Sequence, residues 1–192
     1  MYEFILFLFS VLASLSVALS AVKFDRWLAD KKELKSILLG IGFEMAENIS
    51  IARTVAKKAE DNIKTLQNMK HPFAPFPAFS DLAYLRAKNS DVFFRFVDKE
   101  RTDVARDLVK NLHECYNAIR LVNSMIESEQ QVKLEIMMGR CPKEYGEQLL
   151  ATTRRTVQEA IEPQLVKTLL LLGQVEPKLN KTIWLLAKSE QI

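Results

Sequence analysis

The feature that most constrains the fold is an uninterrupted apolar run near the start of the chain. Residues 4–22 are nineteen consecutive positions without a charged side chain. As a helix this run would be about 29 Å long, close to the roughly 30 Å hydrocarbon core of a bilayer. Tyr2 precedes the run and Phe24 and Trp27 follow it, as aromatic rings do at the two interfaces of a membrane. The run predicts a single transmembrane helix, a signal anchor over residues 1–22.

The charges on either side of this run predict its orientation. Glu3 precedes it, whereas five basic residues follow: Lys23, Arg26, Lys31, Lys32 and Lys35. Because basic residues prefer the cytoplasmic side, we expect the N-terminus outside and residues 23–192 in the cytoplasm. The first four of these basic residues are also candidate contacts for lipid headgroups, at about 1 kcal/mol per charge near an anionic surface. The alternative is that they act as a topology signal alone.

A cleaved signal peptide is the alternative to an uncleaved anchor. Ala18 and Ser20 form the small-x-small pattern of a cleavage site. However, Glu3 lies where a signal peptide carries a positive charge, and the apolar run exceeds the roughly 7–15 residues expected of one. These two departures favour the uncleaved anchor.

One face of the predicted transmembrane helix carries small side chains. Ser10, Ser14 and Ala18 are spaced by four residues. Small residues at this spacing let two transmembrane helices approach closely, so these three are the candidate residues for helix packing in the membrane. The alternative is a monomeric anchor, since small residues are common in such helices.

The rest of the chain is predicted to be helical nearly throughout. Five glycines and six prolines in 192 residues are too few for a turn-rich all-β fold. Apolar residues recur three or four positions apart, which predicts three long helices over residues 25–69, 91–138 and 142–172. Two short helices are expected over 80–88, with Ser80 as N-cap, and over 177–188. The predicted fold class is all-α, a transmembrane helix followed by an antiparallel helical bundle.

Two features inside the predicted long helices call for special packing. Asn48 and Asn62 fall on the apolar stripe of the first one. Buried, they would fix the register of the bundle; the alternative is a place at its edge, bonded to water. Pro163 falls inside the third long helix, where its missing N–H predicts a kink.

Residues 71–79, rich in proline and phenylalanine, break the helical pattern. Their three prolines favour extended backbone, and Phe73, Phe76 and Phe79 alternate with them. So much aromatic surface is unusual in an exposed loop. Either the rings fix the loop onto the bundle, or they dock a partner; we take these three as candidate partner-binding residues.

The sequence predicts no catalytic, cofactor-binding or metal-binding residues. Its two histidines and many carboxylates form none of the common hydrolase, nucleotide-binding or zinc-protease motifs. Its two cysteines, Cys115 and Cys141, have neither zinc-ligand nor disulfide spacing, which suits a reducing compartment. A net charge of +3 is too small to indicate nucleic acid as a partner. We therefore expect a protein that is not an enzyme.

Together these patterns predict a membrane-tethered helical interaction or scaffold protein. It would bind itself or a membrane-associated protein at the inner face of the bilayer. The alternative is a self-assembling, membrane-active effector whose cytoplasmic bundle controls oligomerisation of the transmembrane helix.

Overall fold

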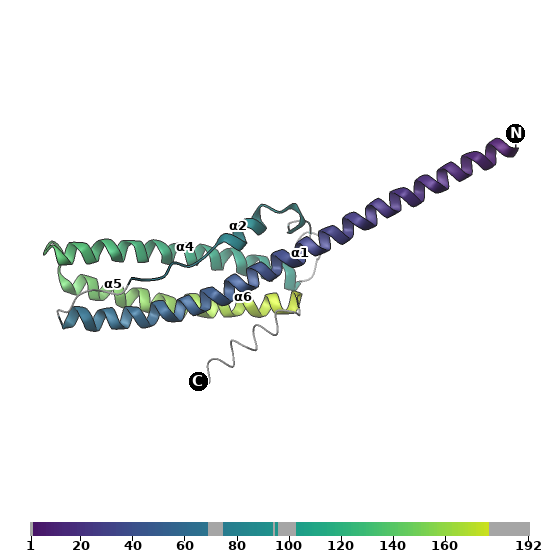
Figure 1. The fold of residues 1–192 in the computed structure, drawn as a ribbon. Coiled ribbons are helices and arrows are strands. Elements are labelled where there is room, and N and C mark those ends of the chain that lie inside the picture. Colours follow the sequence, from purple (N-terminus) through teal and green to yellow (C-terminus); the bar gives the residue numbers. More distant parts are fainter. Residues whose placement is uncertain (1, 69–74, 94, 96–102, 177–192) are drawn as a thin grey trace. The chain divides into compact units, whose positions relative to one another are not determined.

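The computed structural model describes residues 2–68, 75–93, 95 and 103–176, without the side chains of residues 2–10 and 105. The chain divides into two compact units, residues 1–36 and 37–192. The described residues form helices joined by turns and contain no strand (Figure 1). The prediction of an all-α chain is therefore confirmed, while the helix predicted over 177–188 lies outside the described residues.

The first unit is the beginning of a single helix, α1, which runs over Tyr2–Gln67. All side chains over residues 11–29 are exposed. Among the helices of the described residues, none combines the length and the apolarity needed to cross a membrane. The transmembrane helix over residues 1–22 stays a prediction.

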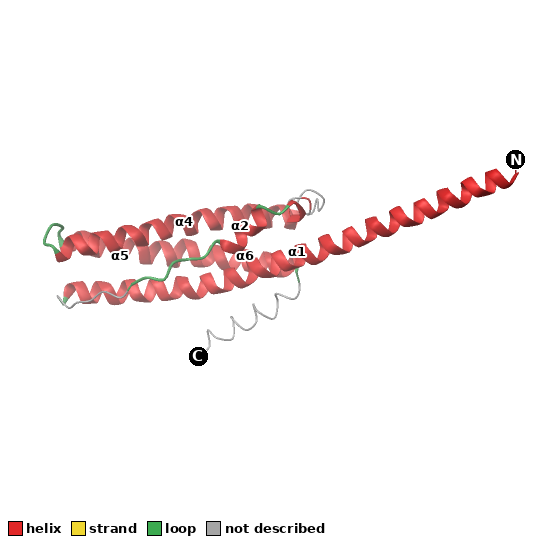
Figure 2. Cartoon of the chain, turned by 45° about the horizontal axis from the view of Figure 1, so that its top comes forward, coloured by secondary structure: helices red, strands yellow, loops and turns green. Residues whose placement is uncertain are grey.

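The second unit contains the rest of α1, followed by α2 (Leu82–Lys88), α4 (Asp103–Met137), α5 (Lys143–Thr156), the π-helical turn η1 (Val157–Ile161) and α6 (Glu162–Val175). The last three follow one another without a break. Residues 37–67 of α1, helix α4 and the α5–α6 rod lie side by side (Figure 2), so the predicted helical bundle with three long members is confirmed.

The bundle is not uniformly antiparallel. Glu44 and Asn48 of α1 lie level with Tyr116 and Asn123 of α4, so the numbering rises in the same direction along both helices. The α5–α6 rod runs against α1, because Arg53 pairs with Glu162 while Glu60, further along α1, pairs with the earlier Arg154. It also runs against α4, because Asn111 bonds Gln164 while Ile136, further along α4, lies beside the earlier Gly146. The extended segment 75–81 returns the chain along the bundle between α1 and α4 (Figure 1), which makes two parallel neighbours possible.

The predicted apolar stripes form the core of the second unit. The three long members contribute the buried side chains Leu38, Ile41, Met45, Ala52, Val55, Ala59 and Leu66; Leu108, Leu112, Cys115, Tyr116, Ile119, Val122 and Ile126; and Leu150, Val157, Ile161, Leu165, Leu169 and Leu172. Each set recurs at the three- or four-residue spacing that turns one helix face inward.

Gly139 lies just after the end of α4, next to the helix end predicted at residue 138. Its φ of 71° is in the left-handed region, which glycine adopts without steric cost. The N–H of Gly139 donates to the Ile136 carbonyl and that of Arg140 to the Glu135 carbonyl. This is the Schellman pattern of a helix C-terminus, and it reverses the chain into α5.

The distortion that accommodates Pro163 lies one turn before the proline, whereas the kink was predicted at the proline itself. The wider turn η1, Val157–Ile161, directly precedes α6, and Pro163 is the second residue of that helix. A proline inside an α-helix removes one hydrogen bond and crowds the carbonyl four residues before it. The π-helical turn contains that carbonyl, so the helix widens there to make room for the ring.

Candidate functional site

Two asparagines hold the extended segment 75–81 against the bundle. The Asn48 side chain donates to the Ser80 carbonyl and accepts from the Ser80 N–H, both at 2.9 Å. Asn123 makes the same pair of bonds to Phe79, at 2.9 and 3.0 Å. Each amide thus satisfies both backbone groups of one residue, as a neighbouring strand would. We call Asn48 and Asn123 the asparagine clamp.

Glu44 fixes the next part of the chain, the start of α2. Its Oε2 atom accepts from the Ser80 hydroxyl and the Ala83 N–H, both at 2.8 Å. Its Oε1 atom accepts from the Tyr84 N–H and the Tyr116 hydroxyl. The prediction of Ser80 as N-cap is wrong, because a carboxylate from α1 satisfies the first N–H groups of α2 instead.

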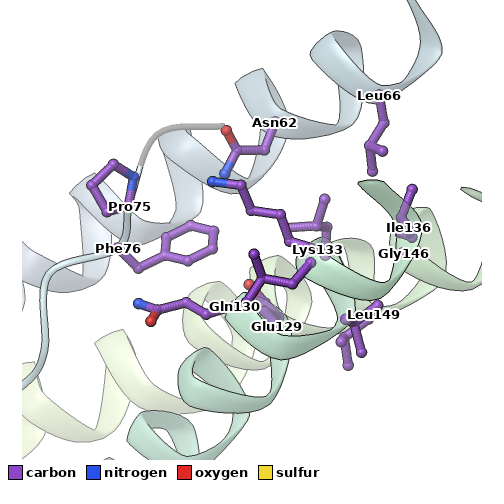
Figure 3. A pocket seen from close by; sticks show the side chains of 13 residues that line it. Asn62, Leu66, Pro75, Phe76, Glu129, Gln130, Lys133, Ile136, Gly146 and Leu149 are labelled. Carbon is purple, nitrogen blue, oxygen red and sulfur yellow. The ribbon is translucent and has the colours of Figure 1, made fainter. Parts of the chain in front are cut away.

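A cavity of about 300 Å³ lies at the end of the bundle where α4 turns into α5 (Figure 3). Helices α1, α4 and α5 and the extended segment line it. The lining is mostly apolar: Leu66, Pro75, Phe76, Val132, Leu134, Ile136, Gly146, Leu149 and Leu150. The polar lining residues are Asn62, Glu129, Gln130 and Lys133. Its volume is at the lower end of the range typical of ligand pockets.

Glu129 is the unusual member of this lining. Glu129 is 6% exposed, and neither carboxylate oxygen has a hydrogen bond of good geometry among the described residues. Burial raises the pKa of Glu129 to about 7, a rise that the neighbouring Thr153 hydroxyl partly opposes. Binding and catalytic sites often contain a buried carboxyl group whose pKa is shifted toward neutrality.

This pKa predicts how Glu129 affects stability. Because the folded pKa of about 7 exceeds the ordinary 4.5, the folded chain binds more protons than the unfolded chain between these values. The contribution of Glu129 to stability therefore falls as the pH rises from about 4.5 to about 7. We expect Glu129→Gln to raise the free energy of unfolding by about 2 kcal/mol at pH 8 and to change it little at pH 4.

Urea denaturation of both proteins at the two pH values measures this difference. Glu127→Gln, a change at an exposed position on the same helix, is the control and should show no such pH dependence. An equal effect of Glu129→Gln at both pH values would contradict the assignment of the raised pKa.

The three phenylalanines predicted to bind a partner have different environments. Phe79 is buried at 4% exposure, and its backbone is held by the clamp. Phe76 is half-buried and lines the cavity, toward which its ring points in Figure 3. Phe73 lies outside the described residues. Phe79 therefore fixes the segment onto the bundle, and a partner-binding role stays a prediction for the other two.

The residues predicted to meet the membrane lie on the first unit. Ser14 and Ala18 are exposed on α1, and the side chain of Ser10 lies outside the described part. Lys23, Arg26 and Lys32 are exposed as well. The Lys31 ammonium lies 4.3 Å from the centroid of the Trp27 ring, a cation–π contact between residues one helical turn apart.

The cysteines and asparagines that the sequence singled out are mostly structural. Cys115 is buried, and burial raises the pKa of its thiol to about 12, which makes it unreactive. Cys141 is a half-buried free thiol in the α4–α5 turn.

Asn48 and Asn62 are both buried, so the alternative that they lie at the bundle edge is wrong. Within the described ranges no group of three or more acidic, histidine or cysteine side chains is placed to hold a metal ion.

Three buried or half-buried polar residues of the second unit were not predicted from the sequence: two hold the extended segment and α2, and the third lines the cavity. Glu44, Asn123 and Glu129 resemble the many charged and polar residues of exposed helix faces. One signal was available for Glu129, which follows the buried Ile126 by three positions and so falls on the apolar stripe of α4.

The chain was also compared with known proteins. It matches no protein-family model, no curated protein and no solved structure.

Proposed function

We propose that this chain is a non-catalytic interaction protein, tethered to a bilayer by residues 4–22 and presenting its bundle at the inner membrane face. The observation that carries the proposal is the exposure of large apolar side chains on the first unit: Val11, Leu12, Leu15, Val17, Leu19, Val22, Phe24, Trp27 and Leu28. The proposal also includes residues 4–10, whose side chains lie outside the described part.

These apolar side chains point to nearly all sides of the helix. At about 100° per residue, Val11, Leu12 and Val17 face directions at least about 100° apart. A helix that is apolar all round needs an apolar environment on all sides. The hydroxyls of Ser16 and Ser20 donate to backbone carbonyls one turn earlier, both at 2.8 Å. Polar groups satisfied within their own helix are what a lipid environment requires.

The bundle offers a surface for a protein partner at the α4–α5 turn. Large apolar side chains are exposed on both sides of this turn: Leu134, Met137 and Met138 on α4 and just after it, and Tyr145 on α5. Methionine and tyrosine are enriched in protein interfaces. The partner would be a second copy of this chain or another membrane-associated protein, and this turn with Phe76 is our proposed contact region.

Charged substitutions in the apolar run test the tether. Leu12→Arg/Leu15→Arg should release the full-length protein from membranes in alkaline extraction, because each arginine costs about 3 kcal/mol near the centre of a bilayer. The control is Leu121→Arg, which changes an exposed leucine on the bundle and should leave the protein in the membrane pellet. Retention of the double variant in the pellet would contradict the proposal.

A further inference from the structure

We propose that the cavity between α1, α4 and α5 binds a small hydrophobic monoamine, with its ammonium group on the Glu129 carboxylate and its apolar body among Phe76, Ile136 and Leu149. This inference does not depend on the proposed membrane tether, because all lining residues belong to the second unit.

The polar groups of the cavity favour a hydrogen-bond donor with positive charge. Both oxygens of Glu129 are buried without a hydrogen bond of good geometry among the described residues, and the Thr153 hydroxyl lies beside them. A buried carboxylate with so little hydrogen bonding is unfavourable, and an ion pair with hydrogen bonds offsets much of that cost. An ammonium group has three donors and fits this set, whereas a carboxylate ligand would be repelled.

Lys133 limits the number of positive charges that the ligand carries. It lies one helical turn after Glu129 and lines the same cavity, and its side chain extends toward Asn62 of α1 (Figure 3). A second ammonium on the ligand would be repelled by this cation. A single amine with an apolar body limits this repulsion to one ammonium group, which the Glu129 carboxylate offsets.

The apolar part of the lining determines the size and shape of the ligand. Helix α5 approaches α4 closely at Gly146, where an added Cβ would lie 2.5 Å from the Ile136 Cδ1 atom. Leu66 and Leu150 pack together with Ile136 and Phe76 at this end of the bundle. The remaining space of about 300 Å³ suits a compact body such as one aromatic ring on a short alkyl chain.

The charge state of Glu129 makes this binding pH-dependent. Lys133 is the other charged residue that lines the cavity beside Glu129. The polar neighbours from the other helices, Asn62 of α1 and Thr153 of α5, are uncharged. Since the pKa of Glu129 is about 7, the carboxylate predominates only above neutrality. An amine should therefore bind more tightly at pH 8 than at pH 6.

Calorimetric titration of the full-length protein in non-ionic detergent tests the proposal with two matched probes. Phenethylamine carries the ammonium group, and phenethyl alcohol is its neutral counterpart. We expect Glu129→Gln to weaken phenethylamine binding by about tenfold or more, because a charge-assisted hydrogen bond is lost, and to change phenethyl alcohol binding by less than about twofold. Glu127→Gln controls for surface charge and detergent partitioning, and circular dichroism confirms that each variant is folded.

Two results would overturn the proposal. One is equal affinity of phenethylamine for the wild type and Glu129→Gln, which would show that the carboxylate does not recognise the amine. The other is no saturable binding of phenethylamine to the wild type at pH 8.

Discussion

Replacing Glu44 by alanine is expected to lower the free energy of unfolding by about 4 kcal/mol. The carboxylate accepts hydrogen bonds from two hydroxyls, of Ser80 and Tyr116, and from two backbone N–H groups at the start of α2. Tyr116 is fully buried, and burial raises the pKa of its hydroxyl, so the group stays protonated and needs an acceptor. Each orphaned donor costs about 1 kcal/mol or more.

Urea denaturation followed by circular dichroism measures this loss. Glu44→Gln should lose about half as much, because its amide keeps one acceptor oxygen and its NH₂ group faces donors. The control is Glu47→Ala, at an exposed position one turn later on α1, which should change stability by less than about 0.5 kcal/mol. A Glu44→Ala variant as stable as the control would show that the hydrogen bonds to Glu44 do not support the fold.

Loss of either member of the asparagine clamp is expected to cost about 3 kcal/mol. Asn48→Ala leaves the backbone N–H and carbonyl of Ser80 without their partners, and Asn123→Ala does the same to Phe79. Because both clamp residues hold one segment, the double variant should lose less than the sum of the two single losses.

Two measurements check the clamp. Urea denaturation gives the three free energies of the double-mutant cycle, and limited chymotrypsin digestion reports cleavage after Phe79, which serine follows. Both single variants should be cut there faster than Asn117→Ala, which alters an exposed asparagine of α4. Wild-type stability and wild-type cleavage in both clamp variants would contradict this account of how the segment is held.

The helices and their buried faces could be predicted because their signals are local. Apolar residues three or four positions apart define one face wherever the helix packs, and Gly139 marks a helix end through its own backbone preference. The direction of the helices could not be predicted in this way. It depends on the extended segment 75–81 crossing back along the bundle, and hydrogen bonds to residues 32 to 44 positions away fix that path.

The candidate site was hidden from the sequence for a related reason. A glutamate at position 129 among charged neighbours is typical of a solvated helix face. Its burial depends on the α5 residues packed against that turn of α4 and on the cavity beside it. Phe76 was recognised as unusual, but its place in the cavity lining follows from the clamp, whose second member comes from α4.

Crosslinking of the full-length protein in its native membranes, followed by mass spectrometry, tests the central claim of a tethered interaction protein most directly. We predict recovery from the membrane fraction with crosslinks to a second copy or to one stoichiometric membrane-associated protein, formed near the α4–α5 turn through Lys143. Recovery from the soluble fraction, or from membranes without any crosslinked species, would contradict the account.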